Sequence, residues 1–159
     1  MRLLGVDPGS HVTGYGIIES EPRLCIVEYG CIRLGAKTPF PKRLAEIYDR
    51  LSGIILTNQI RTVCVEEAFF AENAKTALVL GHARGVILLA AQNAKAEIHE
   101  YSPREIKKSV TGNGAASKEQ VQWMIQKILG ANKPIEPLDA SDALAVALCH
   151  ANRSHARFA

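Results

Sequence analysis

Two acidic residues follow short apolar runs that are typical of buried strands. The run Leu3 to Val6 leads into Asp7 and a Pro-Gly turn, and the run Thr62 to Val65 leads into Glu66. Because a buried carboxylate without a partner is costly, each acid needs a cation, hydrogen-bond donors or water. An alternative for Asp7 is that it only caps the turn that follows it.

A second acidic pair opens the last predicted helix. Asp139 and Asp142 lie three residues apart, so both side chains are expected on one face of that helix. Acids at a helix N-terminus also complement the helix dipole, which is a purely structural alternative. If this pair converges with Asp7 and Glu66, the four carboxylates repel one another and cannot all stay ionised without a cation.

A site of this kind predicts metal-dependent hydrolysis. Oxygen ligands without His or Cys favour Mg²⁺, or Mn²⁺ in its place, over zinc. Two such ions about 4 Å apart are the usual arrangement for in-line hydrolysis of a phosphodiester. In that scheme one ion activates the water, and the other takes up charge on the leaving oxygen.

The elements that must position these acids alternate as in an α/β domain. Three extended runs with short links, the last ending at Leu34, predict an antiparallel meander. Hydrophobic spacing and helix start signals then predict the remaining elements in order: a helix over 41–58, a strand over 62–66, a helix over 73–93, a strand over 97–101, a short helix from 102, and helices over 117–129 and 139–152.

Length and composition predict one domain. The chain has 159 residues, 47% of them hydrophobic, and we expect a domain over 1–152 followed by a short basic tail over 153–159. Its four cysteines form no CxxC pair and no zinc-finger spacing, which predicts reduced thiols. The start does not resemble a signal peptide, and the longest apolar run, Val86 to Ala91, is far below the ~20 residues of a membrane span. We therefore expect a cytoplasmic protein with no membrane segment.

The predicted helix over 73–93 is apolar nearly all round. Between residues 77 and 91 only His82 and Arg84 are polar, so the helix must be covered on more than one side. Small residues recur along it at four-residue steps: Ala77, Gly81 and Gly85. We expect this helix to form the interface of a homodimer. The alternative is a central helix enclosed within one subunit.

Taken together, these motifs resemble the RuvC family of Holliday-junction resolvases, which have an RNase H-like fold. The resemblance covers essentially the whole chain in order. The residues that carry it are Gly5 to Ser10, Thr13 to Gly16, Val65-Glu66, Asn73-Ala74, Leu80 to Gly85, Glu100-Tyr101, Lys107, Gly112, Lys118 to Gln122 and Asp139 to Ala145.

The resemblance implies a five-stranded mixed sheet flanked by helices, and an enzyme that cuts two opposed strands of a four-way junction symmetrically to leave ligatable nicks. It implies that Asp7, Glu66, Asp139 and Asp142 are catalytic and bind two metal ions. It also implies that Lys107 and Lys118 contact junction phosphates, that Phe69 engages junction bases, and that the RuvAB branch-migration complex is a partner.

A local basic patch fits a nucleic-acid substrate. Residues 102–133 contain six cations and two acids, a surplus of four that exceeds the net charge of +3 for the whole chain: Arg104, Lys107, Lys108, Lys118, Lys127 and Lys133 against Glu105 and Glu119. Phosphate contacts of this kind give affinity without sequence information. Charged surface that is merely solvated is the alternative.

Three other functions remain open at this stage. Asp7 to Ser10 with Thr13-Gly14 is also similar to the phosphate loop of actin-like ATPases, but those need a second domain that 159 residues cannot supply. A non-catalytic nucleic-acid-binding module would not need four carboxylates. An RNase H-like nuclease acting on RNA or RNA/DNA hybrids is the nearest rival, because only the family resemblance favours DNA.

Overall fold

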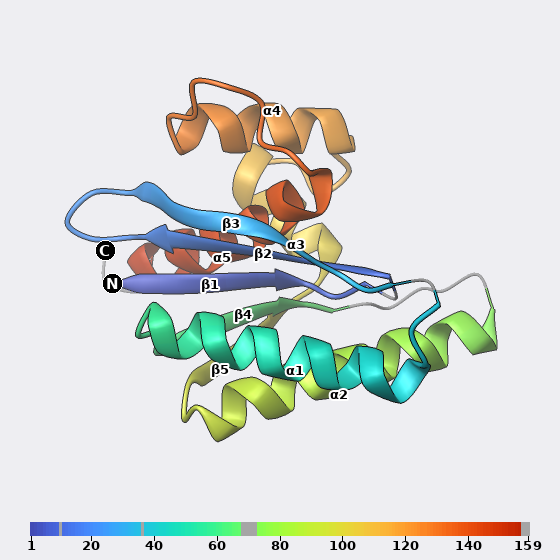
Figure 1. The fold of residues 1–159 in the computed structure, drawn as a ribbon. Helices are drawn as coiled ribbons and strands as arrows, with labels where there is room; N and C mark the ends of the chain where they lie inside the picture. The colour runs from blue at the N-terminus through green and yellow to red at the C-terminus, as the bar shows by residue number, and fades with distance from the viewer. Residues whose placement is uncertain (10, 36, 68–72, 157–159) are drawn as a thin grey trace.

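Helices cover both faces of a five-stranded sheet in the computed structural model, which describes residues 1–9, 11–35, 37–67 and 73–156 (Figure 1). The elements in chain order are β1 (Arg2–Asp7), β2 (Val12–Glu19), β3 (Cys25–Arg33), α1 (Phe40–Thr57), β4 (Thr62–Glu66), α2 (Ala74–Asn93), β5 (Glu97–Tyr101), α3 (Pro103–Thr111), α4 (Lys118–Ile128) and α5 (Leu138–Ala156).

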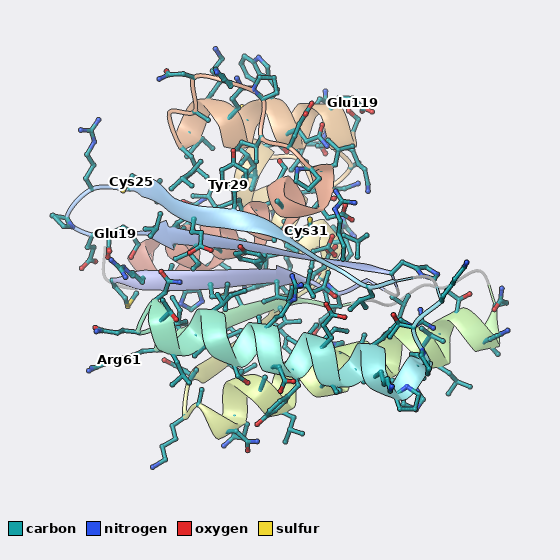
Figure 2. All side chains as sticks on the ribbon, viewed as in Figure 1. Glu19, Cys25, Tyr29, Cys31, Arg61 and Glu119 are labelled. Carbon is teal, nitrogen blue, oxygen red and sulfur yellow. The ribbon has the colours of Figure 1, made fainter. Side chains whose placement is uncertain are left out.

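The sheet has the strand order β3-β2-β1-β4-β5. The first three strands form the predicted antiparallel meander, whereas β4 lies parallel to both β1 and β5. The sheet is therefore mixed, as expected. Strand β3 is an edge, and Cys25 and Tyr29 lie along it with exposed side chains (Figure 2).

Each face of the sheet has its own apolar core. Helices α1 and α2 cover one face, where Leu51 and Ile87 are fully buried. Helices α3, α4 and α5 cover the other face, where Ile125 and Leu144 are fully buried. The sheet therefore separates two layers of helices, and each layer packs on its own side of the sheet.

Helix α5 lies unusually close to β1 and β2, because glycines face it. A Cβ atom added to Gly5 would lie 2.0 Å from the carbonyl oxygen of Ala143, and one added to Gly14 would lie 2.0 Å from that of Asp139. Only a residue without a Cβ fits at either position. The glycines of the sheet thus set the depth at which the first turn of α5, with its two aspartates, is placed.

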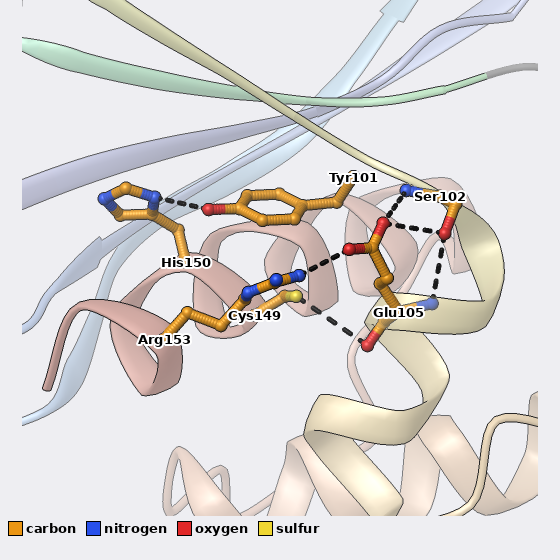
Figure 3. A network of polar contacts seen from close by, with 6 residues as sticks. All are labelled: Tyr101, Ser102, Glu105, Cys149, His150 and Arg153. Carbon is orange, nitrogen blue, oxygen red and sulfur yellow. Dashed lines mark hydrogen bonds and ion pairs between the residues drawn. The ribbon is translucent and has the colours of Figure 1, made fainter. Parts of the chain in front are cut away.

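A polar network fixes α3 against the C-terminal part of α5 (Figure 3). Glu105 accepts hydrogen bonds from the backbone N–H of Ser102 at 3.0 Å and from Arg153 Nη1 at 2.5 Å. The Arg153 guanidinium and Ser102 together lower the pKa of Glu105 to about 2. Tyr101 Oη lies 2.8 Å from His150 Nδ1, which joins the end of β5 to α5.

The same network corrects the predicted end of the last helix. Helix α5 runs to Ala156 instead of ending near Asn152. Residues 153–156 of the expected basic tail are therefore helical. The physical reason is that Arg153 is held by Glu105, a residue 48 positions earlier that a local pattern cannot reveal.

Helix α2 leaves much of its apolar surface exposed. Leu78 and Leu89 are 64% and 52% exposed, and an apolar groove of about 830 Å³ runs along the helix past Gly81 and Gly85. The helix is also the one element of the described residues that is long and apolar enough to cross a membrane, and only 22% of its apolar stretch is buried within the protein. Such a single helix is weak evidence for a membrane span. Arg84 forms an ion pair with Glu100 of β5, which ties the inner side of α2 to the sheet.

The close approach of α5 generates a prediction about Gly5. Replacing Gly5 by Ala should lower the free energy of unfolding by about 1–3 kcal/mol, because the added methyl group collides with the α5 backbone. The matched control is Gly53→Ala in α1, where no atom lies within 4 Å of the added Cβ. That change should stabilise the protein by roughly 0.5–1 kcal/mol. Urea unfolding measures both values, and equal stabilities would contradict the role assigned to Gly5.

Candidate active site

Asp7 and Glu66 lie side by side at the C-terminal ends of two neighbouring strands of the sheet. They end the parallel strands β1 and β4, whose pairing runs up to Val6 and Val65 directly before them. Burial, the negative charges of Glu66 and Asp142, and a hydrogen bond with Glu66 raise the pKa of Asp7 to about 8. Burial likewise raises the pKa of Glu66. The two carboxyl groups are therefore arranged to share a proton or a cation.

Asp142 reaches the same place from the first turns of α5. It lines a pocket of about 330 Å³ together with Asp7 and Glu66. Burial raises the pKa of Asp142, while the nearby ammonium of Lys118, 3.6 Å from its Oδ2, acts in the opposite direction. Three of the four predicted carboxylates thus meet in one pocket.

Asp139 stands apart from that pocket. It lies one turn before Asp142 and is not among the residues that line the cavity. Its negative charge nevertheless raises the pKa of Asp7, of Asp142 and of the Cys31 thiol on β3. Asp139 is therefore close enough to act electrostatically on the other acids, although it does not line this pocket.

The two predicted lysines also line the pocket. Lys107 comes from α3, and Lys118 is the first residue of α4, directly after the N-cap Ser117. The Ser117 side chain and the Gln120 side chain form a capping box that fixes the start of α4. Cationic groups beside a carboxylate cluster can hold a phosphate that the acids alone would repel.

The geometry of the acids fits a cation only in part. Within the described ranges, no three His, Cys, Asp or Glu side chains are already arranged to hold a metal ion. Burial and the negative charges of Glu66 and Asp142 raise the pKa of Asp7, and Asp142 lies 3.6 Å from the Lys118 ammonium. The donors are all carboxylate oxygens with excess negative charge, which is the chemistry that suits hard divalent ions.

One predicted residue cannot be placed, and two further residues line the pocket. Phe69 lies outside the described residues. Pro8 and Glu67 line the pocket although neither was predicted as a site residue, and Glu67 donates its backbone N–H to the carbonyl oxygen of Tyr101 at 2.9 Å. Their place directly after Asp7 and Glu66 is the signal that could have found them.

Comparison with known proteins identifies the family. A sequence model described as "Crossover junction endodeoxyribonuclease RuvC" matches residues 3–150. The chain belongs to the RuvC family. Its fold is accordingly RNase H-like, as the sequence motifs predicted. Proteins of the same description from Chloroherpeton thalassium and Alkaliphilus metalliredigens are 49% and 46% identical to it, over 94% and 98% of this chain and 81% and 95% of their own lengths.

Two solved RuvC structures support the same assignment. The structure of Thermus thermophilus RuvC superposes with a TM-score of 0.91 at 30% identity, covering 99% of this chain and 97% of that one. T. thermophilus RuvC in complex with a Holliday junction substrate superposes with a TM-score of 0.89 at 28% identity, covering 98% and 96%.

The acidic pocket generates a prediction for metal binding. Mg²⁺ or Mn²⁺ at about 100 times its dissociation constant should raise the melting temperature by roughly 5–10 °C, since binding to the folded state adds about 2.7 kcal/mol. Asp7→Asn and Asp142→Asn should shrink this shift. Asp7→Asn should also be more stable than the parent without metal, because the buried charge is removed.

The control is Asp49→Asn, the same change at an exposed position of α1. It should keep the full metal-induced shift in differential scanning fluorimetry. Equal shifts in all of these proteins would show that the acids do not share a metal site.

Proposed function

We propose that this protein is a structure-selective endonuclease that resolves Holliday junctions in homologous recombination and DNA repair. The observation that carries the proposal is the pocket where Asp7, Glu66 and Asp142 meet Lys107 and Lys118 in a chain of the RuvC family. The superposition on a RuvC bound to a junction supports four-way junction DNA as the substrate. The reaction is hydrolysis of one phosphodiester in each of two opposed strands.

The proposed cofactor is a pair of Mg²⁺ ions, for which Mn²⁺ can substitute. Asp7, Glu66, Asp139 and Asp142 would hold them, and the negative charge of Asp139 already acts on Asp7 and Asp142. When bound, such ions supply a nucleophilic water at neutral pH and offset the charge of the phosphodiester. The raised pKa of Asp7 supports this assignment, because burial and the charges of Glu66 and Asp142 disfavour its ionised form, which a bound cation would favour.

The neighbouring side chains have different proposed roles. Lys107 and Lys118 bind phosphates next to the scissile bond, supported by their position in the lining of the acidic pocket. Phe69 engages junction bases; the family resemblance alone supports this role. The nuclease domain spans residues 1–152. The resemblance also supports a cytoplasmic location and the RuvAB branch-migration complex as a partner.

The proposed working unit is a homodimer formed through α2. Its apolar groove is lined by Ala77, Gly81 and Gly85, the small residues at four-residue steps, together with Leu78 and Leu89. No atom lies within 4 Å of a Cβ added at Gly81 or Gly85, so another helix can approach there closely. A two-fold dimer matches the two-fold symmetry of a four-way junction and gives each opposed strand its own site.

The proposed chemistry is tested with Asp7→Asn. This change keeps the shape of the side chain but removes a metal-binding charge, so cleavage of a synthetic four-way junction in Mg²⁺ should fall by at least about 10²-fold. Junction binding should persist or tighten, because repulsion of the phosphates is reduced. Asp49→Asn is the matched control and should cleave normally.

Linear duplex DNA and RNA/DNA hybrids are the substrate controls in the same assay. Preferential cleavage of hybrids by the parent protein would favour an RNA-directed nuclease over a junction resolvase. Normal junction cleavage by Asp7→Asn would show that the acidic pocket is not the catalytic site.

The dimer is tested with Gly81→Glu. The added side chain meets open space in one subunit but would place two like charges opposite each other across the α2 interface. Analytical ultracentrifugation should therefore show monomers. Gly53→Glu on α1, also in open space, is the control and should remain dimeric. A dimeric Gly81→Glu variant would exclude α2 as the interface.

A further inference from the structure

A basic pocket lies beside the sheet on the face opposite the acidic pocket. It has a volume of about 400 Å³ and is lined by His11, Arg43, Asn73, Lys75, Thr76 and Val79. These residues come from the turn after β1 and from the first turns of α1 and α2. The lining contains three basic side chains and no acid. The α1–α2 basic pocket is therefore distinct from the carboxylate site, whose other walls are α3, α4 and α5.

Local contacts hold the pocket in shape. The Arg43 guanidinium lies over the Phe40 ring, 5.4 Å from its centroid, and its Nη1 is 3.5 Å from His11 Nδ1. The carbonyl oxygen of His11 accepts a hydrogen bond from the backbone N–H of Leu34 at 2.9 Å, which joins the β1–β2 turn to the segment after β3. Three separate segments thus hold their cations around one cavity.

Lys75 is the most available of these cations. It is exposed in the first turn of α2, and no carboxylate of the described residues pairs with its ammonium group. Directly before the helix, Asn73 Oδ1 accepts the backbone N–H of Thr76 at 2.9 Å. The start of the helix is thereby fixed, and Lys75 projects from a defined position.

The surrounding segment is strongly basic. Residues 33–45 contain four cations and no acid: Arg33, Lys37, Lys42 and Arg43. This surplus alone exceeds the net charge of +3 for the whole chain. Of these four cations only Arg43 lines the pocket, and a local surplus of positive charge favours a polyanionic partner.

The position of the pocket indicates which polyanion. Leu44 and Ala74, the chain neighbours of Arg43 and Lys75, line the apolar groove of α2. If two copies pair through α2, their basic pockets flank the interface. His11 follows Pro8 by three residues, and Pro8 lines the acidic pocket, so both pockets lie near the C-terminal end of β1.

We propose that the α1–α2 basic pocket binds a backbone phosphate of the junction strands near the subunit interface, on the opposite side of the sheet from the scissile bond. This inference rests on the proposed function. The pocket adds affinity and orients the junction across the dimer, and it takes no part in the hydrolysis.

The test measures junction binding against salt concentration. Fluorescence anisotropy with a labelled four-way junction is recorded in the Asp7→Asn background, so that the substrate stays intact. Lys75→Gln and Arg43→Gln should each reduce the slope of log K against log salt by roughly 0.9, the value for one phosphate contact on duplex DNA. Lys75→Arg should restore the slope. Lys95→Gln, just beyond the other end of α2, is the matched control and should bind as the background does.

The outcomes separate this inference from the proposed function. If the background protein binds the junction but Lys75→Gln leaves both affinity and slope unchanged, the pocket does not contact phosphate and the inference is wrong. Weaker binding with an unchanged slope also overturns it, because the change then acts through the fold. If the parent neither binds nor cuts junctions, the proposed function itself fails. Melting temperature and dimer content are measured alongside, and Lys75→Gln decides the matter if Arg43→Gln is misfolded.

Discussion

The close contact between α5 and the glycines of the sheet is the constraint on which the rest of the structure depends. Gly5 and Gly14 leave no room for a side chain, so the backbone of α5 rests directly on β1 and β2. This depth sets Asp142 in the same pocket as Asp7 and Glu66. A methyl group at either glycine would displace the helix and, with it, two of the four acids.

The acidic pocket combines two opposing electrostatic demands. Burial and mutual repulsion raise the pKa values of Asp7, Glu66 and Asp142. Lys107 and Lys118 supply positive charge at the wall of the same cavity. A site with this balance gains most from ligands that bring both a cation and a phosphate, which is the combination that a metal-dependent nuclease requires.

The two faces of the sheet divide the proposed work between them. The α3–α4–α5 face carries the acids and their lysines, whereas the α1–α2 face carries the apolar groove and the basic pocket. Both pockets lie near the C-terminal end of β1, so a bound nucleic acid could meet both. The exposed apolar surface of α2 is the surface of the proposed dimer, and within the subunit Arg84 binds Glu100 of the sheet while His82 packs edge-on against Phe40 of α1.

The sequence by itself determined the elements, the acids at the strand ends and the family, because hydrophobic period and turn residues act locally. Only the tertiary structure decided which acids share a cavity: Asp142 lines it and Asp139 does not, although both open the same helix. It also decided that α5 continues to Ala156 and that Arg43 and Lys75 meet in one pocket. These features depend on contacts between residues far apart in the chain, which no local pattern contains.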